Sequence, residues 1–286
     1  MKLIQISSIT KKIALAAFGL FLLLFLPVHL GINLCILRDD GGLWYRAASH
    51  FMGTNYIVKV FEIVLMACVA FHIIIAIIIT IENFFARPVR YKVRIKSKTS
   101  LGSRYMIWTG GIIACFLVLH FINFYFVKHG LIEGKYTASI EKVDAFFQEN
   151  AIKMQNGELS DEKKNALIAQ YQNISEVSSD KMDKERKNLI NLTKQEVKKY
   201  CGEDFTEYEP DFYTMSIELF KNKTYSIIYL LVFIALGLHL SHAIKSLAQT
   251  LGLSHKTYNP FIVFVANFYA IVIPIGFAII PLAIMF

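Results

Sequence analysis

Histidines lie inside the long hydrophobic stretches of this chain. His29, His72 and His120 each lie in a separate stretch, and a fourth stretch contains both His239 and His242. Ionisable side chains in membrane hydrocarbon are rare, face the interior of a helix bundle and usually mark a functional site. A single such histidine is readily explained as a hydrogen-bonded packing residue. One on each of four helices predicts a set of ligands for a group held inside the bundle.

The hydrophobic stretches themselves predict five membrane-spanning helices. The chain has 286 residues, 55% of them hydrophobic, and a mean hydropathy of +0.46, which is typical of a polytopic membrane protein. A helix needs roughly 20 residues to cross the hydrocarbon core. We expect spans over 12–36, 57–84, 105–128, 224–248 and 260–286. The predicted fold class is an all-α membrane protein in which the four histidine-bearing helices form a bundle.

A long polar insertion separates the third span from the fourth. It is rich in Lys, Glu, Asp and Asn and shows helical apolar spacing at Leu167, Ile168 and Tyr171. Ser160, followed by Asp161 and Glu162, is typical of a helix start. We expect two or three amphipathic helices outside the membrane, and a disordered polar loop is the alternative. The chain is thus divided into 1–128, 129–223 and 224–286.

The distribution of charge predicts the orientation. The net charge is +8, and a cluster of basic residues lies between the second and third spans: Arg87, Arg90, Lys92, Arg94, Lys96, Lys98 and Arg104. Short loops rich in Lys and Arg face the cytoplasm. We therefore expect a cytoplasmic N-terminus, an extracytoplasmic C-terminus and an extracytoplasmic insertion. Nucleic acid is not an expected partner, because the basic run lies between two membrane spans.

Depth in the membrane sorts the histidines into two pairs. Counted along their helices, His29 and His120 lie roughly 25 Å from the inner boundary, and His72 and His239 lie roughly 10 Å lower. This layering predicts two haem groups, an outer one held by His29 and His120 and an inner one held by His72 and His239. Haem iron bound by two imidazoles carries single electrons and has no open site for oxygen. His242 shares a face with His239 and is the alternative inner ligand, or a hydrogen-bonding partner.

Small residues occur at the depth of the inner pair. Gly19 precedes His29 by ten residues, and Gly110 and Gly111 precede His120 by ten and nine. A glycine there gives a flat macrocycle room against the backbone. Small residues also mark close helix contacts in membranes, and both interpretations stay open.

Four charged residues near the ends of the spans are further candidates. Glu62 is either an acid that exchanges protons with a quinone near the outer haem or a carboxylate favoured by a helix N-terminus. Arg46 and Lys59 are either partners of the outer-haem carboxylates or interfacial anchors. Lys245 either meets an inner-haem carboxylate or extends to the membrane surface.

Five motifs together carry a family resemblance. They are LPVHLGIN at His29, AASHFM at His50, ACVAFH at His72, VLHFINF at His120 and LGLHLSHAIKSLAQTLG at His239. As a set, spaced over five spans, they resemble the five-helix, two-haem cytochrome b subunit of succinate dehydrogenases and fumarate reductases. The resemblance covers roughly 12–128 and 211–286. In that family the fourth-span ligand precedes a glycine at the inner helix end by 12–13 residues, which matches His239 and Gly252 better than His242.

The resemblance implies a function that this chain performs with partners. It implies two haem b groups, a cytoplasmic flavoprotein subunit with FAD, an iron–sulfur subunit, and a membrane quinone, either menaquinone or another quinone, that reacts near the outer haem. It also implies a bacterial cytoplasmic membrane. The 129–223 insertion departs from the usual short connection and puts the quinone-site geometry in doubt. The alternatives are a dihaem cytochrome b of a hydrogenase or formate dehydrogenase, and a haem-free transporter or membrane anchor.

Overall fold

The computed structural model describes residues 7–86, 101–157, 159–161, 163–165, 168–169, 191–201 and 205–286. Several residues on which the sequence predictions rest lie outside these ranges: Arg87, Arg90, Lys92, Arg94, Lys96, Lys98, Glu162, Leu167 and Tyr171.

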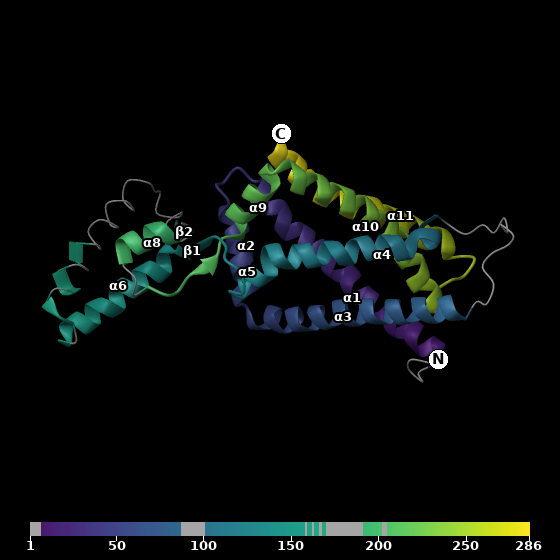
Figure 1. Ribbon diagram of the computed structural model, residues 1–286, viewed down its shortest axis with the longest axis horizontal. Coiled ribbons are helices and arrows are strands. Elements are labelled where there is room, and N and C mark those ends of the chain that lie inside the picture. The colour runs from purple at the N-terminus through teal and green to yellow at the C-terminus, as the bar shows by residue number, and fades with distance from the viewer. Residues whose placement is uncertain are drawn as a thin grey trace. The chain divides into compact units, whose positions relative to one another are not determined.

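Five helices are long and apolar enough to cross a membrane, which confirms an all-α membrane protein (Figure 1). They are α1 (Ser8–Leu34, extended by the 3-10 helix Cys35–Leu37), α3 (Tyr56–Phe85), α4 (Leu101–His120), α10 (Lys223–Thr250) and α11 (Asn259–Met285). After His120 the third span continues as a π-helix, Phe121–Tyr125, and ends in α5, Phe126–Lys128. The observed spans begin and end within a few residues of the predicted ones.

Local sequence explains where these helices begin. Ser7 caps α1 by accepting a hydrogen bond from the Thr10 backbone. Asn55 caps α3 and Asn222 caps α10 in the same way, because a short polar side chain satisfies backbone N–H groups that lack helical partners. Pro260 lies in the first turn of α11, where its missing N–H is not needed.

The spanning helices differ in how closely their backbones approach. Helix α10 packs closely on α11 and α4, and α1 packs on α3, α10 and α11. A Cβ added to Gly237 of α10 would lie 2.8 Å from the Ala270 carbonyl oxygen of α11, so this contact requires glycine. Within the described ranges, neither α1 with α4 nor α3 with α10 forms an extensive backbone contact. The outward faces carry exposed apolar side chains, such as Ile63 and Trp108, that suit a lipid environment.

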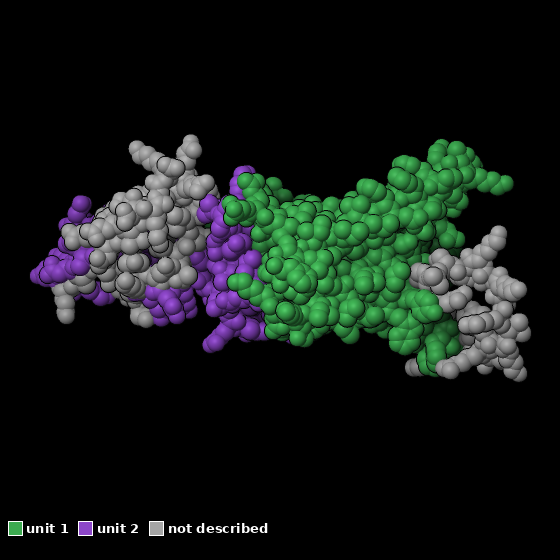
Figure 2. Space-filling view, turned by 90° about the horizontal axis from the view of Figure 1, so that it is seen from above, with its two compact units in different colours: residues 1–39, 48–120, 219–286 green, residues 40–47, 121–218 purple. Residues whose placement is uncertain are grey.

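The chain divides into two compact units (Figure 2). One consists of 1–39, 48–120 and 219–286, and the other of 40–47 and 121–218. The second unit contains the helices α6 (Ile140–Gln155) and α8 (Lys194–Cys201) and a sheet of three antiparallel strands in the order β2-β1-β3. The strands are β1 (Tyr136–Ser139), β2 (Asn191–Thr193) and β3 (Glu209–Pro210).

A small apolar core holds the second unit together. Val143 and Phe147 of α6 pack with Val197 and Cys201 of α8, and Ala138 and Phe205 complete the buried cluster. The sequence predicts only helices here, so the sheet is a difference from that prediction. Its strands have two to four residues, too few for a period of two to be recognised in the sequence.

Two further helices flank the spans. Helix α2 (Leu43–Thr54) follows the first span, where the sequence suggests only a connection, and α9 (Phe212–Lys221) precedes the fourth. Gly41 and Gly42 lead into α2 with φ of 65° and 84°, a conformation that favours glycine. The Asp40 side chain accepts a hydrogen bond from the Gly42 backbone at 2.9 Å, which stabilises this turn.

Candidate functional site

The imidazoles of His29 and His120 face each other from two helices. His29 lies on α1 and His120 is the last residue of α4, and their ring centroids are 5.9 Å apart with an interplanar angle of 84°. Metal–imidazole nitrogen bonds are about 2 Å long, so a metal between two imidazoles holds their centroids roughly 6 Å apart. The spacing of this pair therefore suits one metal ion with two axial histidines.

Aromatic side chains surround the outer pair. Phe25 stacks on His29 with centroids 5.1 Å apart, and Phe277 of α11 lies 5.6 Å from the same ring. Phe116 stacks on His120 at 5.7 Å. These rings form an apolar surround that excludes water and offers flat faces to a flat ligand.

Asn33 fixes the orientation of His29. Its amide nitrogen donates to the His29 carbonyl oxygen at 2.7 Å and lies 3.3 Å from Nδ1 of the ring, which leaves Nε2 for a metal. A metal-bound imidazole carries its proton on the other nitrogen and donates from there. Binding of a metal at Nε2 therefore requires the Asn33 amide to turn its oxygen toward Nδ1.

His72 lies on α3 and His239 on α10, and these two are the predicted inner ligands. A Cβ added to Gly19 would lie 3.3 Å from Cε1 of His72, and one added to Gly110 would lie 3.4 Å from Cε1 of His239. Because glycine has no Cβ, Gly19 leaves room for the His72 ring and Gly110 leaves room for the His239 ring. A larger side chain at either position would push the imidazole away. Gly111 faces open space.

Thr109 orients His239. Its hydroxyl is buried, donates within its own helix at 3.0 Å from the Met106 carbonyl oxygen, and lies 3.4 Å from Nδ1 of His239. A threonine hydroxyl has one proton, so its oxygen is left to accept from Nδ1–H. That hydrogen bond keeps the lone pair of Nε2 available to a metal. Sequence spacing does not single out Thr109, because its role depends on the direction of its side chain toward His239 on another helix.

His242 occupies a different environment. It is half-buried and lies one helical turn before Lys245 on α10. Because Thr109 and Gly110 both contact His239, the geometry favours His239 over His242 as the inner ligand.

These residues fit a haem. The candidate ligands are imidazoles, the donor type that haem iron takes; His29 and His120 face each other, and each predicted pair comes from helices without close backbone contact. Among the described residues no group of three or more His, Cys, Asp or Glu could hold a bare metal ion. Haem iron needs at most two ligands from the protein, so a haem site does not require a group of three or more ligating residues.

The other candidates lie away from the histidine pairs or engage different partners. Glu62 is half-exposed on α3, ten residues before His72 and thus about 15 Å along the helix. Lys59 and His50 are exposed.

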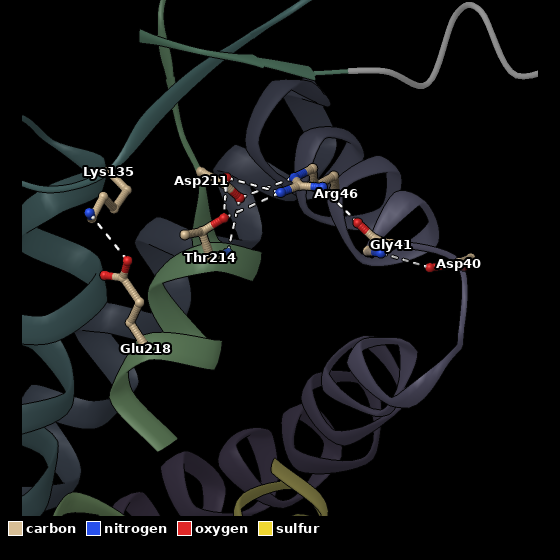
Figure 3. A network of polar contacts seen from close by, with 8 residues as sticks. Asp40, Gly41, Arg46, Lys135, Asp211, Thr214 and Glu218 are labelled. Atoms are coloured by element: carbon tan, nitrogen blue, oxygen red, sulfur yellow. Dashed lines mark hydrogen bonds and ion pairs between the residues drawn. The ribbon is translucent and has the colours of Figure 1, made fainter. Parts of the chain in front are cut away.

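Arg46 binds a carboxylate of the protein itself (Figure 3). Its Nε and Nη2 donate to the two oxygens of Asp211 at 3.1 and 3.0 Å, and its Nη1 donates to the Gly41 carbonyl oxygen. Thr214 donates to the same carboxylate through its hydroxyl, at 2.6 Å, and through its backbone N–H. Arg46 therefore pairs with Asp211, where the sequence suggested a haem carboxylate or an interfacial anchor.

Comparison with known proteins identifies no relative: no family model, curated protein or solved structure matches the chain. Its function is therefore inferred from the paired histidines and the sequence motifs around them.

Proposed function

We propose that this chain is the membrane-anchoring dihaem cytochrome b subunit of a succinate dehydrogenase or fumarate reductase complex. It would pass electrons between a cytoplasmic flavoprotein and iron–sulfur enzyme and a membrane quinone. The observation that carries the proposal is the facing pair His29 and His120, whose rings meet at 5.9 Å inside an aromatic surround. The motif resemblance supplies the enzyme class and the quinone.

Each residue of the two pairs has a stated task. His29 and His120 would hold one haem iron, and His72 and His239 would hold the other. Bound haem would supply one-electron transfer, and ligation by two imidazoles would favour electron transfer over oxygen chemistry. Thr109 would hold the ring of His239 in place and so preorganise that ligand, and Asn33 would do the same for His29 once its amide has turned.

The remaining roles concern proton exchange and assembly. Glu62 takes up a proton when a quinol is oxidised near the outer haem and returns it when a quinone is reduced. The flavoprotein with FAD and the iron–sulfur subunit dock at the cytoplasmic side of a bacterial inner membrane, where the basic connection lies. Succinate or fumarate reacts on the flavoprotein and not on this chain.

The test is the haem content of the purified chain and of its histidine variants. We expect a reduced-minus-oxidised spectrum with two b-type haems per chain. His29→Ala and His120→Ala should lose the same haem, and His72→Ala and His239→Ala the other. His50→Ala, which removes an exposed histidine of α2, is the matched control and should retain both.

Three results would contradict the proposal or part of it. If the purified chain carries no haem even when haem is supplied in excess, a haem-free transporter or anchor would be favoured. Loss of haem from His242→Ala but not from His239→Ala would reassign the inner ligand. A copurifying hydrogenase or formate dehydrogenase, without succinate or fumarate activity in the whole complex, would identify the alternative electron-transfer subunit.

A further inference from the structure

Asn267 places an amide on the outward face of α11. Phe264 and Ile271, one turn to either side, are 64% and 56% exposed. A polar group facing hydrocarbon is costly unless each of its atoms has a hydrogen-bond partner. The Asn267 oxygen accepts from Nζ of Lys245 at 3.1 Å, but within the described ranges the amide N–H groups donate to nothing. The amide therefore offers two donors to whatever lies against this face.

Lys245 brings a positive charge to the same place. Among the described residues, its ammonium donates to two neutral groups, the Asn267 oxygen and the Ser241 hydroxyl, the latter at 3.4 Å. No ion pair of the described residues includes Lys245, and Glu82, the carboxylate at the end of α3, pairs with Lys11. A charge on a membrane-spanning helix without a counter-ion is expensive, so this site favours an anion from outside the chain.

The cluster lies within reach of a membrane surface. Lys245 precedes the end of α10 at Thr250 by five residues, or about 7 Å of helix. A long side chain at that depth extends to the headgroup region.

We propose that Ser241, Lys245 and Asn267, which meet where α10 packs on α11, bind the phosphate of an anionic phospholipid. Phosphate oxygens accept hydrogen bonds from the ammonium and from the outward amide N–H groups. The stacked and exposed rings of Phe264 and Phe268, 6.1 Å apart, provide an apolar surface for the acyl chains. The site does not depend on the haem proposal.

A lipid explains the position of Asn267 better than a haem carboxylate does. Its neighbours on the same face are exposed apolar residues, so its donors point toward the lipid side of α11. A carboxylate held between the histidine-bearing helices would leave those donors unsatisfied.

The experiment compares lipid binding by the purified full-length chain. Delipidated protein in one detergent is titrated with phosphatidylglycerol or phosphatidylcholine, and retained lipid is counted by native mass spectrometry. The wild type should prefer phosphatidylglycerol. Lys245→Gln should weaken that lipid about fivefold and leave phosphatidylcholine unchanged, and Lys245→Arg should restore the preference.

Two variants separate the site from general effects. Lys256→Gln removes an exposed charge from the connection between α10 and α11 and should bind like the wild type. Asn267→Leu keeps the charge and should also weaken phosphatidylglycerol, so it tests the site even if Lys245→Gln does not fold. An unchanged preference in Lys245→Gln would overturn the proposal. So would an unchanged preference accompanied by loss or altered potential of a haem, which would assign Lys245 to a haem carboxylate.

Discussion

His29 and His239 differ in the polarity of the hydrogen-bonding group that lies at Nδ1. Nδ1 of His239 faces a hydroxyl oxygen that accepts, whereas Nδ1 of His29 faces an amide nitrogen that donates. Only the first arrangement already holds the tautomer that binds metal through Nε2. If the proposed haem binds, the His239 tautomer already suits iron, and His29 would reach the same state when the Asn33 amide turns.

Replacement of Thr109 tests the role of this hydroxyl. Thr109→Val keeps the shape but removes the acceptor for Nδ1–H, so the imidazole becomes a weaker donor to iron. We expect the potential of the inner haem to rise by roughly 40 mV, the one-electron equivalent of a hydrogen bond worth ~1 kcal/mol. Redox titration followed in the haem spectrum measures the shift.

Thr109→Ser is the matched control for that titration. It restores the hydroxyl in a smaller side chain and should return the wild-type potential. Equal potentials in Thr109→Val and the wild type would show that the hydroxyl does not act on the haem. A shift in the outer haem would show that the histidine pairs are assigned to the wrong layers.

The sequence predicts some of these residues and not others. His29, His72, His120 and His239 stand out because histidine is rare in apolar helices, and Gly19 and Gly110 because of their depth. Asn33 follows His29 by one helical turn, a spacing that could have revealed it. The contact of Thr109 with His239 crosses 130 positions and depends on how α4 and α10 face each other.

At the scale of elements, one ion pair joins α2 to the start of α9. The Asp211 carboxylate caps α9 by accepting a hydrogen bond from the Thr214 backbone N–H. The same carboxylate accepts two hydrogen bonds from the Arg46 guanidinium of α2. The Arg46 guanidinium also lies 4.7 Å from the ring centre of Tyr213. A Cβ added to Gly42 would lie 2.5 Å from that ring, so glycine permits the close approach.

Removal of the Asp211 charge should destabilise this junction. Burial by itself raises the pKa of Asp211, but hydrogen bonds from Arg46 and Thr214 and the Arg46 charge outweigh it, and the pKa lies below 3.8. The ionised Asp211 carboxylate contributes its full stabilisation of the fold above its ordinary pKa. That stabilisation is lost as the pH falls through the lower pKa that Asp211 has in the folded protein. Asp211→Asn should therefore cost about 2 kcal/mol of unfolding free energy at pH 7 and much less in strong acid.

Thermal unfolding in detergent across this pH range measures the difference. Glu218→Gln is the control, because the Lys135–Glu218 pair is exposed on both sides and contributes little. An Asp211→Asn loss no larger than that of Glu218→Gln, or one that grows in acid, would contradict the ion-pair account.

The boundaries of helices were predictable where a long run of apolar residues defines the element. Five apolar runs define the spans, and a short polar residue, Asn55, caps the start of α3. Helix α2 is missing from the prediction because its amphipathic pattern is short and lies between two spans. The pairing of β1 with β2 and β3 joins residues far apart in the chain, and nothing local indicates it.

For the whole molecule, the charge pattern predicts the orientation in the membrane, and labelling can test it. In a background where the four native cysteines are replaced by serine, Leu131→Cys lies just beyond the third span and Ser254→Cys lies between α10 and α11. An impermeant maleimide applied to intact spheroplasts should label Leu131→Cys only. Permeabilised spheroplasts should show both labels, which is the control for accessibility. Labelling of Ser254→Cys in the intact preparation would reverse the proposed orientation.

The native Cys201 can stay in that experiment if its replacement weakens the fold. It is buried in the core of the second unit, and burial raises its pKa to about 12. The reactive thiolate is therefore scarce at the pH of labelling.

The π-helical turn that follows His120 changes which way the side chains at the end of the third span point. A π-turn adds one residue to the helix, so the side chains after Tyr125 are rotated by about 100° from the positions that an unbroken α-helix would give them. A helical wheel drawn through the entire span would assign Phe126 and Val127 to the wrong sides. Deletion of a single residue within Phe121–Tyr125 would restore the regular phase, leaving His120 in place while turning everything beyond it.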